Sequence, residues 1–353
     1  MPTKALSELE ELVGDSRVTV EGFQIEAGKV AEFARAVTDP NPVFRSTKAA
    51  TQNGHERIPA PPTYTRVGNF PRYAPDGVEG HGFDLGFRPE YILHGEHVYE
   101  YERPAFVGDI LTGTTTLTNL YERDGDRAGT MTFAILETAY RDQHGELVLT
   151  ERATVIESDG AVDTETDRTA ETSAETDDSS DSSNEYPRGE TLATSNSSGE
   201  RVRTREGDDT VTRPEIESVA ELEVGEDVPT VAVEDIERQD FVRYAGASGD
   251  FNPIHYDEPY ARAAGNETVF GQGMFAAGIS SRVVTDWFGI SALESFGVRF
   301  QSQLFPGETV TAGGTVTEID RNKDVVETVL EATTETGKTL LTGTATATLS
   351  GDD

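Results

Sequence analysis

A carboxylate and an imidazole lie five positions apart in the segment SGDFNPIH, residues 248–255. The pair is Asp250 and His255, and the Asn252-Pro253 dipeptide between them is typical of a tight turn. A carboxylate beside an imidazole orients the ring and shifts its pKa, so the two groups can exchange a proton with a bound molecule. The alternative is a purely structural turn in which Asp250 only caps the backbone. The spacing alone does not decide between a functional pair and such a turn.

A second feature downstream favours chemistry at this loop. The segment GQGMF, residues 271–275, places glycines where a longer helical pattern begins. The first turn of a helix has N–H groups without a partner in the helix and carries the positive end of the helix dipole. Such groups can stabilise an oxyanion. Close packing or a turn would also account for the glycines.

The frame D-x-N-P occurs twice in the chain. It is found in VTDPNPVF, residues 37–44, and again 211 positions later in the segment described above. RPAFVGDILTG (103–113) and QLFPGETVTAG (303–313) also match, with Phe106/Phe305 and Gly108/Gly307 aligned at an offset of 199. One net insertion in the first copy, within the Gly/Pro-rich residues 70–89, explains the shorter offset. The repeated order of motifs predicts an internal duplication.

Both copies are expected to follow one plan: a short helix, the D-x-N-P loop, further helix and then strands. Short helices are predicted at about residues 28–38 and 234–246, and a long one over residues 273–289 of the second copy. Thr/Val-rich segments with frequent alternation follow, and these predict strands. The strands are expected at residues 298–304, 308–319, 324–336 and 338–349. A long helix followed by such a meander predicts an antiparallel sheet curled around the helix.

A family resemblance rests on a long run in the second copy, FVRYAGASGDFNPIHYDEPYARAAGNETVFGQGMFAAG. This run resembles the hydratase-2 signature of MaoC-like hot-dog proteins, which are (R)-specific 2-enoyl-CoA hydratases and 3-hydroxyacyl-thioester dehydratases. The first copy resembles their FAS1-like dehydratase N-terminal domain, through APPTYTRV (60–67), ILHGEHVYEYERPAFVGDILTG (92–113) and GELVLTERATVI (145–156). The resemblance implies an α+β fold, a double hot-dog in which each half is an antiparallel sheet wrapped around a long central helix. Its domain order is similar to a fusion of the two subunits of mycobacterial-type 3-hydroxyacyl-ACP dehydratases.

Three regions follow from this comparison and from composition. Residues 1–157 are expected to form a degenerate N-terminal hot-dog, and residues 214–353 the catalytic MaoC-like hot-dog. Residues 158–213 contain only five large apolar residues, too few to offset the loss of chain entropy on folding. They are predicted to be an acidic disordered linker, with a partner-binding tail as the alternative.

The resemblance assigns roles to five residues of the second copy. Asp250 and His255 match the catalytic pair, which activates a water that adds across the 2,3 double bond of an enoyl thioester. Gly273 matches the glycine whose N–H binds the thioester carbonyl. Ser281 matches a hydroxyl position that lines the pocket, and Asn252 fits a supporting role in shaping the loop. The substrate is a CoA or acyl carrier protein thioester, and neither a metal nor another cofactor is expected.

Two departures from the family pattern stand out. In the first copy, Phe44 replaces the histidine and Pro61-Pro62 replaces the glycine region, and Pro62 has no N–H to donate. With Asp39 alone this copy is expected to be non-catalytic, and the family pairing implies that it shapes the acyl tunnel, with Phe44 as an apolar wall. In the second copy, Gln272 replaces the usual histidine and is expected to alter contacts on the ligand side rather than the chemistry.

Composition excludes several other classes of protein. The net charge is -36, and only five of the 29 basic residues are lysine. This pattern predicts adaptation to molar salt, where screening shortens the Debye length to about 3 Å; a merely well-solvated surface is the alternative. No basic patch for nucleic acid is found. No secretory signal or membrane-spanning run is found either, which predicts a cytoplasmic protein.

Rival interpretations remain at this point. His94 and His97 invite a metal site, but three-residue spacing in a strand points side chains to opposite faces, so the pair is expected to be a poor chelate. A hot-dog acyl-CoA thioesterase and a non-catalytic acyl-CoA binding protein are the alternative functions. The fused halves already supply a pseudo-dimer, and a homodimer of the whole chain is left open.

Overall fold

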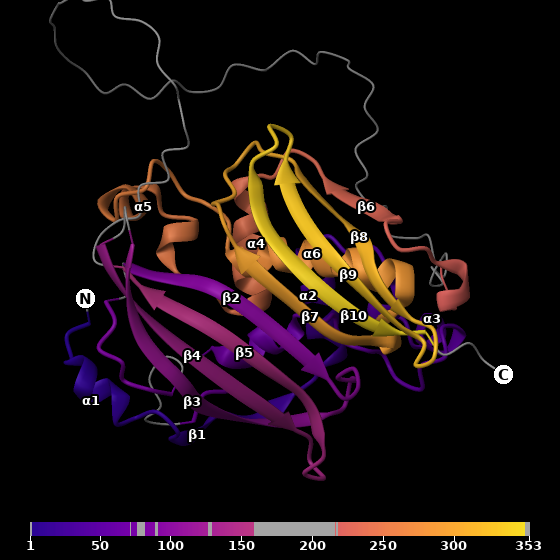
Figure 1. The fold of residues 1–353 in the computed structure, drawn as a ribbon, viewed down its shortest axis with the longest axis horizontal. Helices are drawn as coiled ribbons and strands as arrows, with labels where there is room; N and C mark the ends of the chain where they lie inside the picture. Colours follow the sequence, from indigo (N-terminus) through magenta and orange to yellow (C-terminus); the bar gives the residue numbers. More distant parts are fainter. Residues whose placement is uncertain are drawn as a thin grey trace, which may run out of the picture.

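The structure, a computed structural model, describes residues 2–70, 72–75, 82–88, 91–125, 129–158, 216 and 218–349. Its strands form one ten-stranded sheet in the order β1-β3-β4-β5-β2-β7-β10-β9-β8-β6. Outward from the β2–β7 junction, each half repeats the same order: its own second, fifth, fourth, third and first strand. Figure 1 shows the two curved halves meeting along β2 and β7. The sheet therefore contains two copies of one topology, as the predicted duplication requires.

Each half contributes five strands, and each strand of the N-terminal half is longer than its counterpart in the C-terminal half. In the N-terminal half they are β1 (Ser16–Gln24), β2 (Ile92–Tyr101), β3 (Ile110–Gly125), β4 (Gly129–Arg141) and β5 (Leu147–Glu157). In the C-terminal half they are β6 (Asp227–Val233), β7 (Leu293–Phe300), β8 (Val310–Asp320), β9 (Val325–Thr334) and β10 (Thr339–Thr348). The four strands predicted in the C-terminal half are present, with the first beginning five residues earlier than expected.

The helices lie mainly against one side of the sheet. The α-helices are α1 (Leu6–Glu10), α2 (Ala27–Ala36), α3 (Thr47–Gln52), α4 (Arg238–Ser248), α5 (Glu258–Ala263) and α6 (Gly273–Phe288). Short 3-10 helices are η1 (Pro42–Phe44), η2 (Tyr64–Asn69), η4 (Val219–Glu221), η5 (Pro253–His255) and η6 (Ile290–Ala292). Both predicted short helices are found, shifted by a few residues as α2 and α4. None of the described helices combines the length and apolar character needed to cross a membrane.

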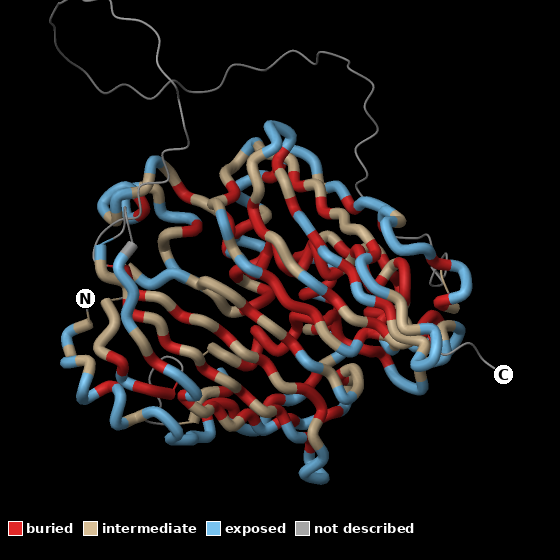
Figure 2. The backbone as a smooth tube through the Cα atoms, viewed as in Figure 1, coloured by how far each residue is buried: buried red, intermediate tan, exposed pale blue. Residues whose placement is uncertain are grey.

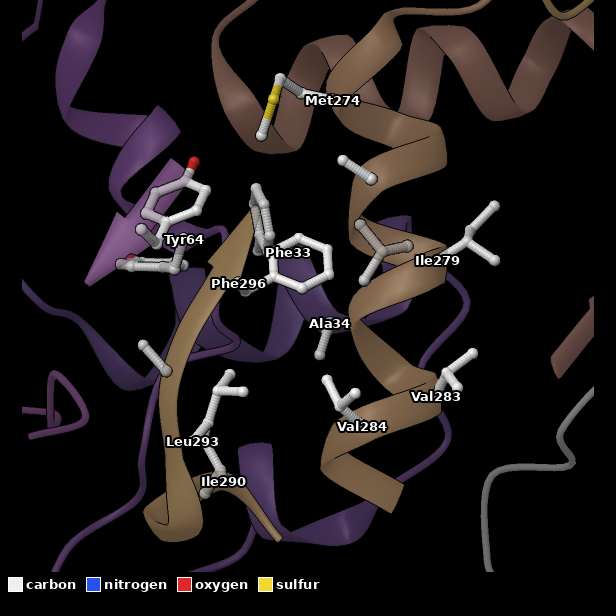
Figure 3. Close-up of a cluster of buried hydrophobic side chains, with 14 of the residues drawn as sticks. Phe33, Ala34, Tyr64, Met274, Ile279, Val283, Val284, Ile290, Leu293 and Phe296 are labelled. Carbon is white, nitrogen blue, oxygen red and sulfur yellow. The ribbon is translucent and has the colours of Figure 1, made fainter. Parts of the chain in front are cut away.

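Helix α6 is the centre of the core. Most of its residues are buried, as expected for a helix that is apolar nearly all round. It packs against the strands of its own half, and Phe33 and Ala34 of α2 belong to the same buried cluster as Val284 of α6 (Figure 3). Gly278 is required at this contact, because a Cβ there would lie 2.5 Å from Val37 Cγ1. Figure 2 shows the continuous buried region that results.

The two halves differ in their central helix, and here one expectation is wrong in detail. The double hot-dog is present, but among the described residues only the C-terminal half has a long central helix. Its counterpart in the N-terminal half is the short η2, Tyr64–Asn69. Pro61-Pro62 removes two backbone donors at its start, and Gly68 weakens its end. The interior of the N-terminal sheet is therefore only partly filled by helix.

The expectation that His94 and His97 point to opposite faces of a strand is also wrong. The β2–β5 pairing shifts register between His94 and Glu96, so Gly95 forms a bulge. The bulge brings the two imidazoles together, with His94 Nε2 3.0 Å from His97 Nδ1. No group of three possible metal ligands is found within the described residues. The predicted linker, apart from Ser158, lies outside those residues.

Candidate active site

The loop after α4 places Asp250 and His255. Helix α4 ends at Gly249, whose φ of 91° is the left-handed conformation that glycine adopts without strain. The Asn252 side-chain oxygen accepts a hydrogen bond from the N–H of Ile254 at 3.2 Å, and Pro253 then begins η5. The turn lies between Asp250, which is half-buried, and His255, which is buried. Asn252 thus fixes the turn between Asp250 and His255, and its supporting role in a reaction stays a prediction.

His255 has one defined tautomer. It is 8% exposed, and its Nδ1 lies 2.8 Å from the carbonyl oxygen of Phe270. A carbonyl only accepts, so Nδ1 carries the hydrogen. Burial lowers the pKa of His255 below its ordinary value, while the Asp250 charge and the Phe270 hydrogen bond act in the opposite direction. The ring is therefore neutral at pH 7, and Nε2 presents a lone pair that can accept a proton.

Gln272 joins this loop to the start of α6. It is 2% exposed, and its Nε2 donates to the carbonyl oxygens of Phe241 at 3.2 Å and Asp250 at 3.4 Å. The amide oxygen has no hydrogen-bond partner within the described residues, and the expected effect of Gln272 on ligand-side contacts stays a prediction. Gln272 positions Asp250 relative to α6, a role that sequence spacing did not indicate.

Gly273 is the first residue of α6 and lies at the helix terminus. Its N–H belongs to the first turn, where backbone donors have no partner inside the helix. A Cβ at this position would lie 3.1 Å from Cδ1 and Cε1 of Phe300, so the Phe300 ring packs directly against the glycine. The absence of a side chain lets another group approach the N–H closely. A free N–H at a helix N-terminus can stabilise an oxyanion, and this role of Gly273 stays a prediction.

Ser281 lies two turns further along α6. It is buried, and its hydroxyl donates to the carbonyl oxygen of Gly278 at 2.8 Å. The hydroxyl oxygen can still accept a hydrogen bond, but among the described residues its one partner lies within its own helix. The predicted role of Ser281 in lining the pocket stays a prediction.

The N-terminal half contributes a buried charge that sequence reasoning missed. Arg66, on η2, is 9% exposed. Burial acts to lower the pKa of this guanidinium, but the negative charges of Asp250 and Glu151 help to raise the pKa above its ordinary value. Arg66 also lies over the ring of Phe70, 5.4 Å from its centroid, and a Cβ on Gly249 would be 2.9 Å from Phe70 Cβ. Phe70 therefore packs between Arg66 and the residue that precedes Asp250.

Together these contacts form a site suited to proton transfer. It has an oriented neutral imidazole, a neighbouring carboxylate and a helix N-terminus that can bind a developing negative charge. Arg66 could not have been recognised from spacing, since it lies 184 positions from Asp250. The only available signal was that APPTYTRV, which contains Arg66, is one of the segments that carry the family resemblance.

Comparisons with known proteins agree with the fold and with the division into halves. Residues 11–151 match the FAS1-like, dehydratase domain region, and residues 218–338 match the MaoC like domain. A UPF0336 protein of Thermobifida fusca (strain YX) is 31% identical over 130 residues, which cover 37% of this chain and 80% of the relative.

Solved structures extend the similarity to nearly the whole chain. One described as a MaoC-like dehydratase is 25% identical, with a TM-score of 0.72 over 97% of this chain and 100% of its own. A Mycobacterium tuberculosis protein described as having a double hot-dog fold shares that fold at 13% identity, with a TM-score of 0.59 over 95% of this chain and 96% of its own. The chain therefore belongs to the MaoC-like dehydratase family, in the double hot-dog form that joins a FAS1-like dehydratase region to a MaoC-like domain.

Proposed function

We propose that the chain is a hydro-lyase that reversibly hydrates trans-2-enoyl-CoA to (3R)-3-hydroxyacyl-CoA. The observation that carries this proposal is the state of His255: neutral, with Nδ1 bonded to Phe270 and Nε2 able to accept a proton. Membership of a dehydratase family supports the reaction class. The stereochemistry and the CoA thioester come from the resemblance of the loop to the hydratase-2 signature.

The groups of the site have complementary roles in this reaction. Water is held between Asp250 and His255, and its proton passes to His255 Nε2 as its oxygen bonds to C3 of the substrate. The electron pair of the double bond moves towards C2 and the thioester carbonyl. The Gly273 N–H stabilises the enolate-like oxygen, and Asp250 stabilises the imidazolium. Transfer of a proton to C2 then restores neutral His255, so no protein group is consumed.

Neither a metal nor a redox cofactor takes part in this proposal. Addition of water to a conjugated thioester changes no net oxidation state, and each proton transfer is assigned to a residue of the chain. Full activity after treatment with a chelator is the expected result. Activity lost to the chelator and restored by a divalent cation would contradict this part of the proposal.

The N-terminal half is proposed to receive the acyl chain and not to catalyse. It carries no counterpart of His255 or of the Gly273 donor, since Phe44 and Pro62 occupy those positions. The fused halves form the pseudo-dimer that places Arg66 beside the catalytic loop. Acyl carrier protein remains a second candidate carrier of the thioester, to be compared with CoA in the same assay.

One assay tests the reaction class. Crotonyl-CoA is supplied in molar KCl, as the proposed adaptation to salt requires, and both the absorbance of the conjugated thioester and the release of free thiol are followed. Loss of absorbance without thiol is the expected outcome. Thiol release would establish a thioesterase instead, and no change in either signal would favour a protein that only binds acyl-CoA.

A further inference from the structure

The last turn of α4 and the start of the catalytic loop are held by side chains of the N-terminal half. Helix α4 contacts α2 and η2, which both belong to that half. The contacts fall on residues 244–250, and this segment ends at Asp250. Because only Gly249 separates α4 from Asp250, a shift of the last turn of α4 would also move the Asp250 carboxylate.

Lys29 of α2 caps the C-terminal end of α4. The last carbonyl groups of a helix have no partner inside the helix. In α4, the carbonyl oxygen of Ala245 accepts a hydrogen bond from the N–H of Gly249 at 2.8 Å. The next carbonyl oxygen, that of Gly246, accepts a hydrogen bond from Lys29 Nζ at 2.9 Å. A cation at this end of a helix also interacts favourably with the helix dipole, so Lys29 stabilises the last turn in two ways.

The surroundings of Lys29 suit it to this role. Its side chain is only 19% exposed, and its Nζ lies 3.0 Å from Oε2 of Glu32, which is three residues further along α2. The Glu32 carboxylate therefore helps to hold the ammonium group beside the end of α4. Lys29 is one of only five lysines among the 29 basic residues of the chain.

Residues at η2 contact the two positions that follow α4. A Cβ on Gly249 would lie 2.9 Å from Phe70 Cβ, so Phe70 packs directly on the turn that begins the loop. The Arg66 guanidinium lies over the Phe70 ring, 5.4 Å from its centroid. Arg66 is buried and interacts electrostatically with Asp250. The N-terminal half therefore places a positive charge near the catalytic carboxylate.

The body of α4 is fixed separately, by buried aromatic rings. The ring of Tyr244 lies 5.9 Å from that of Phe33 on α2 and 5.6 Å from that of Phe275 on α6, measured between centroids. Close packing of this kind leaves little room for the helix to move. Loss of the polar contacts of Lys29 or Arg66 is therefore expected to affect the last turn and the loop rather than the whole helix.

We propose that the N-terminal half positions the catalytic carboxylate, with Lys29 holding the last turn of α4 and Arg66 attracting Asp250. This inference rests on the proposed function, because it takes Asp250 to act in the hydration. Lys29 and Arg66 act through Asp250 and not on the substrate, so both are positioning residues. The silent half then contributes to catalysis by fixing where Asp250 lies relative to His255.

Lys29→Met tests the cap, since it keeps an apolar side chain of similar length and removes the donor. With crotonyl-CoA in molar KCl, kcat is expected to fall about tenfold and KM to stay within about twofold, because a misplaced catalytic group slows the reaction more than it weakens binding. Amide hydrogen exchange at Gly249 and Asp250 should become about tenfold faster, as the loss of one hydrogen bond allows. Lys29→Arg, which keeps a cation, should restore kcat to within about threefold of wild type.

Lys4→Met is the matched control. Lys4 also joins a backbone carbonyl to a carboxylate, since its Nζ lies 2.9 Å from the carbonyl oxygen of Asp84 and 2.8 Å from Asp84 Oδ2. Its side chain is 26% exposed, close to the value for Lys29. Lys4→Met should leave kcat and the exchange at Gly249 and Asp250 as in wild type. Equal losses of kcat in Lys4→Met and Lys29→Met would overturn the proposal, because any buried lysine would then have the same effect.

A double-mutant cycle tests Arg66. Arg66→Gln should lower kcat about tenfold in the wild-type chain, but by about twofold or less in the Asp250→Asn chain, which has no carboxylate to attract. Equal losses in the two backgrounds would show that Arg66 only supports the fold, and would overturn its part in the proposal. If Arg66→Gln does not fold, the Lys29 variants decide the proposal.

Hydrogen exchange distinguishes failure of this proposal from failure of the proposed function. A wild-type chain that does not hydrate crotonyl-CoA would refute the proposed function. Unchanged exchange at Gly249 and Asp250 in Lys29→Met would instead refute the hold on α4, whatever reaction the protein catalyses. Faster exchange with an unchanged kcat would also overturn the proposal, because the last turn of α4 would then loosen without affecting the reaction.

Discussion

The two D-x-N-P loops have almost the same backbone. Asn41 and Asn252 have φ, ψ angles of -57°, 118° and -60°, 122°, respectively. Each side-chain oxygen accepts a hydrogen bond from the N–H two residues ahead, at 3.0 Å to Val43 and 3.2 Å to Ile254. In both loops the following proline begins a 3-10 helix. The turn is therefore a structural element that the fold keeps in both halves, whether or not chemistry takes place there.

The loops differ in what their side chains face. Phe44 is 1% exposed and belongs to the hydrophobic core, whereas His255 donates from Nδ1 to a carbonyl and leaves Nε2 available. Asp39 is 3% exposed and Asp250 is half-buried. Nearly identical backbone frames thus hold a buried carboxylate beside a phenylalanine in one half and a half-buried carboxylate beside a histidine in the other. The D-x-N-P motif by itself does not indicate an active site.

Each half places an arginine near the aspartate of the other half's D-x-N-P loop. Arg66 of the N-terminal half interacts with Asp250, and Arg282 of α6 interacts with Asp39. Arg282 also donates to the hydroxyl of Thr38 at 3.0 Å, next to Asp39. Each aspartate therefore faces an arginine of the opposite half. The two halves therefore share this reciprocal arrangement, although only the C-terminal loop contains the histidine.

The largest expected effect comes from making the active loop resemble the silent one. His255→Phe copies the N-terminal loop, and Asp250→Asn removes the carboxylate; each should lower kcat/KM for crotonyl-CoA by roughly 10³-fold, as loss of a general acid–base group does. Asp39→Asn is the matched change in the other loop and should stay within about threefold of wild type. If Asp39→Asn were as inactive as Asp250→Asn, the two loops would both be catalytic and the comparison would fail.

The second expected effect concerns the helix N-terminus. Pro62 stands where the C-terminal half has Gly273, so Gly273→Pro copies the silent half and deletes the N–H, and proline is well tolerated at the first position of a helix. Removal of one oxyanion donor should cost roughly 10²-fold in kcat. Gly273→Ala is the control, because it adds a Cβ against Phe300 but keeps the N–H. Equal losses in the two variants would show that crowding, not the donor, is responsible.

Sequence patterns predicted the features that depend on local periodicity or on repetition. The offset between the D-x-N-P frames predicted two copies, and the apolar pattern of residues 273–289 predicted α6 almost to its ends. Four of the five strands of the C-terminal half were also predicted, since their side chains alternate between buried and exposed, as in β9. The short strand β6 was not predicted.

Features set by long-range contacts were not predictable in this way. The bulge at Gly95 changes which face His94 occupies, and such a bulge depends on the partner strand β5 rather than on local sequence. The position of Arg66 near Asp250 depends on how the halves pack. The shortened central helix of the N-terminal half is consistent with Pro61-Pro62, because proline both lacks an N–H donor and disfavours a helix interior.

A smaller effect is expected in the pH dependence of the active loop. Since burial lowers the pKa of His255, the folded protein keeps the ring neutral below pH 6.5, and kcat/KM should stay level from pH 7.5 to 6.5 and fall only at lower pH. The lowered pKa of His255 also contributes to the free energy of unfolding. This contribution is fully present above pH 6.5 and is lost as the pH falls through the lowered pKa. NMR titration of the His255 ring provides the check. In Asp250→Asn the titration should move to still lower pH, because the Asp250 charge raises this pKa; a shift to higher pH would contradict the assignment.

The smallest expected effect is on the stability of the silent loop. Burial raises the pKa of Asp39 despite the opposing charges of Arg282 and Arg45 and the Asn41 hydrogen bond. The folded state therefore binds this proton more tightly than the unfolded state, and the stability linked to it is lost as the pH rises above 3.8 through the folded pKa. Asp39→Asn is always neutral and escapes this loss, so its free energy of unfolding relative to wild type should be more favourable at pH 7.5 than at pH 5. Urea denaturation at both pH values measures the difference. The reverse trend would show that the charge of Arg282 outweighs burial and keeps the Asp39 carboxylate charged.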